Sequence, residues 1–118
     1  VEIFAANSVP VTFYGHTHMP SYVDSTGTQV LLQAGEPQVF NPFDGVKRMF
    51  NPGSVGQPRD GDPRASAGIL TIHGNPRSRD SRWVFNVVRR SYDIDSVVAR
   101  YHQLGLPDRN GTRLYTGR

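Results

Sequence analysis

Short apolar runs rich in β-branched and aromatic residues, separated by turn-forming residues, recur along this chain and predict a strand-rich structure. The first run, residues 9–14, predicts a buried strand with Val11 and Phe13 on one face. Further strands are predicted at residues 21–24, 29–32, 46–50, 67–72 and 82–89. The polar stretches 25–28 and 74–81 each separate two of these strands, so each of them predicts a hairpin.

One segment has the period of a helix. Asp93 is a good N-cap residue, and the apolar residues that follow it at helical spacing are Ile94, Val97, Val98, Tyr101 and Leu104. Gly105 and Pro107 predict where this helix ends. Its apolar stripe is expected to pack on the sheet as part of an outer layer, so its role would be structural. The segment 34–45 contains two prolines and two glycines and predicts a loop.

Strands combined with a helix predict an α/β fold, and the length, together with the absence of repeats and linkers, predicts that residues 1–118 form one domain or part of one. Residues 1–7 have a helix-compatible apolar arrangement, in which Asn7 would be an acceptable left-handed stop. The chain is therefore expected to begin inside an element, as the C-terminal portion of a longer domain. A chain of this size would bury roughly 65% of its unfolded surface, enough for a core if its sheet is complete.

Composition narrows the chemistry. The chain has no cysteine, which excludes disulfides, thiolate ligands and a cysteine nucleophile and is compatible with the cytoplasm. No apolar stretch approaches 18 residues, so no segment is predicted to span a membrane. We therefore expect a cytoplasmic protein without a membrane partner.

Charge is segregated along the chain. Residues 1–46 contain four acidic residues and no Lys or Arg, whereas residues 47–118 contain all 13 basic residues, and 12 of these are Arg. A basic surface could attract a phosphorylated substrate or could bind nucleic acid. The aromatic residues Trp83, Phe85 and Tyr92 lie among these arginines. Because Trp83, Phe85 and Val87 alternate as a strand's core face does, nucleic-acid binding is the weaker alternative.

The candidate chemistry is concentrated in Gly15-His16-Thr17-His18, at the end of the first predicted strand. In an extended chain, side chains two positions apart point the same way, so one site could receive both imidazoles. Gly15 lets the backbone turn sharply, and Pro20 prevents a regular strand from continuing. The motif predicts a metal-binding corner, and the alternative is a pair of solvated histidines at a loop entry.

A second motif strengthens the metal interpretation. The stretch 50–66 reads FNPGSVGQPRDGDPRAS. Together with the Gly-His-Thr-His corner it resembles the C-terminal half of the calcineurin-like metallophosphoesterases, in particular the small bacterial branch that includes diadenosine-tetraphosphatase-like and uncharacterised phosphoesterases. The resemblance implies part of a four-layer α/β/β/α sandwich. It also implies a two-metal hydrolase in which His16 and His18 each ligate a different ion.

Two divalent ions roughly 3.5–4 Å apart can share a bridging hydroxide and clamp the phosphoryl oxygens during in-line displacement. The substrate implied by the resemblance is a phosphomonoester, a phosphodiester or a dinucleotide polyphosphate. Imidazole suits Mn, Fe, Zn, Co and Ni, so the sequence leaves the identity of the two metal ions open.

The chain departs from the family pattern in its metal motifs. The pattern also requires an Asp-x-His, a Gly-Asp-x-x-Asp, a Gly-Asn-His and a further His, and none of these is present. The near matches at 61–65 and 74–77 come after His18 in chain order and predict turns. The missing ligands are therefore expected from an N-terminal segment of the same domain. The alternative is a non-catalytic fragment or partner subunit, and an incomplete sheet would also favour an oligomer.

Arg59 and Arg64 follow the second motif and could contact a substrate phosphate through a bidentate guanidinium. Asp60 and Asp62 are immediate neighbours, so local ion pairing is the alternative explanation of both arginines. The two remaining histidines are expected to be ordinary surface or capping residues and lie at positions 73 and 102.

Overall fold

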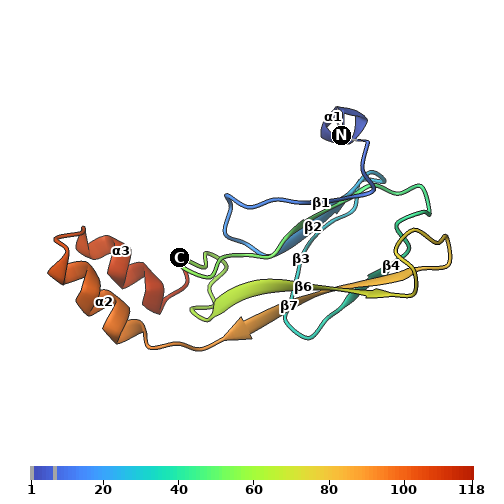
Figure 1. The fold of residues 1–118 in the computed structure, drawn as a ribbon. Helices are drawn as coiled ribbons and strands as arrows, with labels where there is room; N and C mark the ends of the chain where they lie inside the picture. The colour runs from blue at the N-terminus through green and yellow to red at the C-terminus, as the bar shows by residue number, and fades with distance from the viewer. Residues whose placement is uncertain (1, 7) are drawn as a thin grey trace.

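The computed structural model describes residues 2–6 and 8–118, and it has two β-sheets with helices beyond them (Figure 1). The strands are β1 (Val11–Phe13), β2 (Ser21–Asp24), β3 (Gln29–Leu31), β4 (Gln38–Phe40), β5 (Arg48–Asn51), β6 (Ala65–His73) and β7 (Arg82–Arg90). The helices are α1 (Glu2–Ala6), α2 (Ile94–Gln103), α3 (Asp108–Thr112) and the 3₁₀ helix η1 (Arg113–Tyr115). The predicted Asn7 stop lies outside the described residues.

The two sheets have different topologies. The first has the strand order β1-β5-β2-β3, in which β1 is parallel to β5 and the other pairs are antiparallel. The second has the order β4-β7-β6 and is antiparallel throughout. The predicted hairpins are both present as β2–β3 and β6–β7. The mixed α/β class predicted from the sequence is confirmed.

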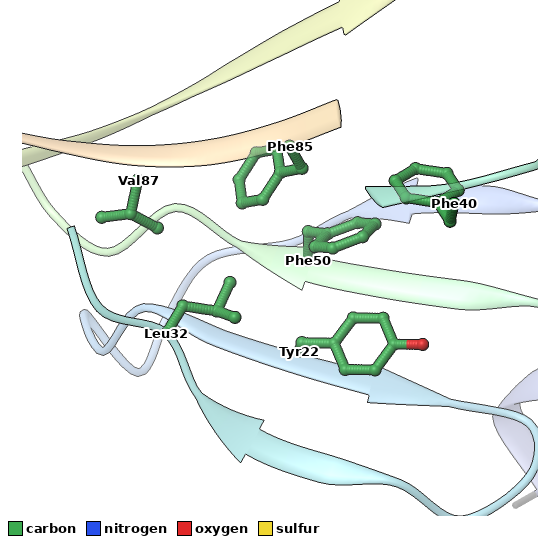
Figure 2. Packing of buried hydrophobic residues seen from close by; sticks show 6 residues of the cluster. All are labelled: Tyr22, Leu32, Phe40, Phe50, Phe85 and Val87. Carbon is green, nitrogen blue, oxygen red and sulfur yellow. The ribbon is translucent and has the colours of Figure 1, made fainter. Parts of the chain in front are cut away.

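The core lies between the sheets and is largely aromatic (Figure 2). Phe50 of β5 is completely buried, and its ring centroid lies 4.6 Å from that of Phe85 on β7 and 5.1 Å from that of Tyr22 on β2. Phe85 and Val87 are buried and Trp83 packs against the cluster, so the predicted shared face of β7 is confirmed. Phe50 therefore joins the two sheets.

Two strand predictions are wrong in part. The predicted loop 34–45 contains β4, because Gln38–Phe40 pairs antiparallel with β7 in spite of the flanking prolines. The predicted strand at 9–14 is shorter, and Phe13 is 48% exposed instead of buried. The reason is that β1 pairs only with β5 among the described residues, so it is an edge strand.

The predicted C-terminal helix is present as α2, and the Asp93 carboxylate accepts from the Ser96 backbone N–H at 3.0 Å, as an N-cap should. Its predicted packing is wrong. No residue of α2 is buried, and Figure 1 shows α2 beyond the end of the β6–β7 hairpin, beside α3. The sequence reasoning missed α3, whose buried Gly111 lies against Val98 and so covers part of the apolar stripe. Among the described residues, no helix is long and apolar enough to cross a membrane.

Candidate metal-binding corner

The Gly15–His18 segment is a tight turn at the end of β1. The last sheet-type hydrogen bond runs from the Tyr14 N–H to the Phe50 carbonyl at 3.0 Å. His16 and His18 then adopt φ values of 76° and 61°, in the left-handed region that non-glycine residues rarely occupy. The extended conformation predicted from the sequence is therefore wrong here. For this reason, side-chain alternation does not direct both rings to one site. Left-handed non-glycine residues cluster at functional sites.

The half-buried His18 ring is oriented by the loop that follows β5. Its Nδ1 lies 2.8 Å from the backbone carbonyl oxygen of Gln57. A carbonyl oxygen can only accept, so Nδ1 carries a hydrogen, and in the neutral ring Nε2 is the nitrogen with the lone pair. The backbone N–H of Arg59 also donates to the His18 carbonyl at 3.2 Å. The imidazole is thus held in the tautomer that presents Nε2 to a ligand.

His16 lies at the surface, and its ring makes no hydrogen bond with the residues of 2–6 and 8–118. Asn51, the fully buried last residue of β5, fixes the backbone around it. The Asn51 Nδ2 donates to the Gly15 carbonyl at 3.2 Å and to the Thr17 hydroxyl at 2.9 Å. Asn51 lies within the second sequence motif, whose pattern alone predicted no role for this residue.

The Asn-Pro-Gly-Ser turn is fixed to β6. Gly53 has a φ of 84°, and a Cβ built there would lie 2.6 Å from the Ser66 Oγ, so only glycine fits. The Ser66 hydroxyl donates to the Pro52 carbonyl at 2.7 Å, and the Ser66 N–H donates to the Ser54 carbonyl at 2.9 Å. These bonds fix the position of the turn relative to the sheet. They thereby also help to fix the position of the Gln57 carbonyl, which follows the turn.

The two predicted substrate arginines differ in their surroundings. Arg64 forms a bidentate ion pair with Asp62, and this hydrogen bonding holds the pKa of the Asp62 carboxyl at about 2. Asp60 pairs instead with the buried Arg89. The Arg59 guanidinium donates to the Gln57 Oε1 at 2.8 Å and forms no ion pair within the described residues. Local pairing thus explains Arg64 and leaves Arg59 available beside the corner.

The described residues do not form a complete metal site. No group of three or more His, Asp, Glu or Cys side chains among them is arranged to hold an ion. His73 ends β6 and His102 lies 3.1 Å from Asp108, and both are exposed. Residues 2–6 and 8–118 therefore offer His16 and His18 as candidate ligands without the further ligands of a complete site.

Comparison with known proteins places these features in context. No protein-family model matches the chain. An uncharacterised protein of Methanocaldococcus jannaschii is 36% identical over 106 residues, which cover 90% of this chain and 39% of the relative. The crystal structure of a metallophosphoesterase from Sphaerobacter thermophilus matches with a TM-score of 0.74 and 38% identity, covering 98% of this chain and 45% of that one. The chain resembles part of a metallophosphoesterase.

This similarity confirms the predicted mixed α/β architecture, which is similar to part of a metallophosphoesterase. The chain spans less than half the length of either relative. The small bacterial branch, the C-terminal placement and the metal ligands stay predictions.

Proposed function

We propose that this chain contributes His16 and His18 as metal ligands to a phosphoester hydrolase that uses two divalent ions. The observation that carries the proposal is the hydrogen bond from the His18 Nδ1 to the Gln57 carbonyl, which frees Nε2 in a chain similar to a metallophosphoesterase. Neutral imidazole nitrogen is a ligand that suits Mn, Fe, Zn, Co and Ni. When bound, such ions supply Lewis-acid activation of water and neutralise charge on the phosphoryl oxygens.

The remaining ligands would come from a segment outside this chain, namely the N-terminal part of the same domain. An apolar hollow of about 350 Å³ supports this part of the proposal. It is lined by Phe13, Pro52, Gly68, Leu70 and Phe85. The hollow lies where the edge strands β1 and β6 have no further partner among the described residues. A longer chain, as in both relatives, would cover this surface, and a second copy of the chain is the alternative occupant.

The same hollow favours a second candidate function. If the chain works without its own catalytic centre, it would act as a non-catalytic fragment or subunit that needs the missing half. Stoichiometric binding of two metal ions by the 118-residue chain alone would exclude this candidate.

For either candidate function, we propose that the protein acts in the cytoplasm. We propose a phosphorylated small molecule or nucleotide as substrate in preference to a nucleic acid.

Removal of metal tests the hydrolase directly. The natural-length protein is expected to hydrolyse p-nitrophenyl phosphate or bis-p-nitrophenyl phosphate, to lose this activity on dialysis against a chelator, and to regain it with Mn²⁺. The reason is that the proposed reaction depends on water activated by bound ions, to which His16 and His18 would be ligands. Hydrolysis that survives complete metal removal would contradict the proposal.

Arg59 and Arg64 make a matched pair for substrate binding. Arg59→Ala is expected to raise KM for a phosphate ester about 10-fold, since one charge-assisted hydrogen bond contributes about 1.5 kcal/mol. Arg64→Ala is expected to leave KM within about 2-fold of wild type, because its guanidinium is already engaged by Asp62. Steady-state kinetics on both variants measures the two KM values. An equal change of KM in both variants would contradict a role of Arg59 in substrate binding.

A further inference from the structure

Asn51 is the most completely buried polar side chain beside the metal-binding corner. Its Oδ1 accepts from the Gly53 N–H at 2.9 Å, and its Nδ2 donates to the Gly15 carbonyl and the Thr17 hydroxyl. The two Nδ2 partners belong to the residues immediately before and after His16. The Asn51 amide therefore binds the residues on both sides of His16 and makes no hydrogen bond with its ring.

His16 needs such support. A non-glycine residue in the left-handed region is less stable than in its usual conformations, and it persists only where its surroundings fix it. The Thr17 N–H donates back to the Gly15 carbonyl at 3.0 Å, which is a contact within the turn itself. The contacts with Asn51 link the residues on either side of His16 to the sheet, because Asn51 is the last residue of β5 and follows Phe50, which is buried in the core.

The same connection between β5 and β6 also reaches the second histidine. Its Gln57 carbonyl accepts from the His18 ring, and its Arg59 N–H donates to the His18 carbonyl. One rigid segment, which starts at Asn51, thus holds both candidate ligands. If the Asn51 end were released, His18 would keep its contacts while His16 would be free to leave the left-handed region.

From this geometry, and resting on the proposed function, we propose that Asn51 is a positioning residue that holds His16 where it can bind metal together with His18. The side-chain amide is required because it must donate to the Gly15 carbonyl. A carboxylate at this place has no hydrogen to donate and would instead repel that carbonyl oxygen. The effect on the ions would pass through His16, because the Asn51 side chain is fully buried and its Oδ1 accepts from the Gly53 N–H.

The chain offers a matched control in Asn41. Like Asn51, it precedes a proline, its Oδ1 accepts from the N–H two residues on, at Phe43 (2.8 Å), and its Nδ2 donates to a distant carbonyl, that of Arg79 (2.6 Å). It belongs to the connection between β4 and β5, whose described residues make no hydrogen bond with the Gly15–His18 turn. Asn41→Asp therefore makes the same chemical change away from the corner.

The test is a titration of the 118-residue chain with CoCl₂, followed by the visible absorption of the bound ion, with melting temperatures recorded alongside. Asn51→Asp is expected to weaken Co²⁺ binding roughly 10- to 100-fold, the range typical of residues that orient metal ligands. Its absorption should also move toward that of the hydrated ion, because one imidazole is lost. Asn41→Asp is expected to bind Co²⁺ as wild type does.

If Asn51→Asp fails to fold, Thr17→Val serves in its place, since it removes one of the two bracketing bonds from an exposed residue and should weaken Co²⁺ binding several-fold. Wild-type affinity and spectrum in a folded Asn51→Asp or Thr17→Val variant would overturn the inference and leave the proposed function standing. No Co²⁺ binding by either histidine of the wild-type chain would contradict the proposed function as well.

Discussion

Replacing His18 by alanine in the natural-length protein is expected to lower metal-stimulated kcat/KM by about 10³-fold or more. The residue would be a metal ligand, and its loss removes several kcal/mol of electrostatic stabilisation of the transition state. Its ring is also the side chain that the β5–β6 connection orients, through the Gln57 carbonyl. The measurement is hydrolysis of a phosphate ester under saturating Mn²⁺, together with the metal content of the purified variant.

His73→Ala is the control for this variant, because His73 is an exposed histidine at the far end of β6. It should keep both metal and activity. Turnover of His18→Ala equal to that of wild type, at equal protein stability, would remove His18 from the reaction. Loss of activity in both variants to the same extent would point to a general effect on folding.

Phe50→Ala is expected to destabilise the chain by about 4 kcal/mol, which is the usual range for truncating a large buried aromatic residue. Phe50 is fully buried and its ring lies against aromatic residues of both sheets, so the variant leaves a cavity where the sheets meet (Figure 2). Urea denaturation followed by circular dichroism measures the change. The metal-binding corner should loosen too, because Asn51 follows Phe50 and the Tyr14 N–H donates to its carbonyl.

Phe13→Ala is the matched control for the core. Its ring contacts Phe50 and Phe85 with centroids 6.0 and 5.6 Å apart, but it is 48% exposed at the edge of the first sheet. Phe13→Ala should therefore lower the free energy of unfolding by less than half as much as Phe50→Ala does. A loss below about 1 kcal/mol for Phe50→Ala would contradict the packing described for the core.

The elements that the sequence predicted well are those whose signal is local. Both hairpins have alternating strands on either side of a polar turn, and the N-cap of α2 needs only Asp93 and the turn after it. The elements that it missed depend on partners. The strand β4 exists because β7 offers an edge to Gln38–Phe40, and α2 leaves the sheets because α3 lies beside it.

The candidate site divides in the same way. Residue types and spacing singled out His16 and His18, and the motif that contains Asn51 was recognised. The left-handed conformation of both histidines and the bracketing of His16 by Asn51 could not be read from the sequence, because they depend on residues more than 30 positions apart meeting at the ends of β1 and β5. The inference from side-chain alternation was wrong for that reason.

The chain covers 39% of one relative and 45% of the other, and its described residues contain no group of three or more side chains arranged to hold a metal ion. Two imidazoles alone bind a divalent ion weakly and cannot hold a pair of ions. The central claim therefore concerns the Gly15–His18 corner: His16 and His18 are metal ligands, and Asn51 and the β5–β6 connection hold them in place.

The most direct test is ¹⁵N NMR of the imidazole rings of the 118-residue chain during a titration with Zn²⁺. The chain has four histidines, so His73 and His102 serve as internal controls. Before zinc is added, His18 should show a protonated Nδ1 and an unprotonated Nε2. Zinc should then shift the ring nitrogens of His16 and His18 together, at concentrations that leave the other two unchanged. Equal shifts in all four rings, or none in His16 and His18, would contradict the account.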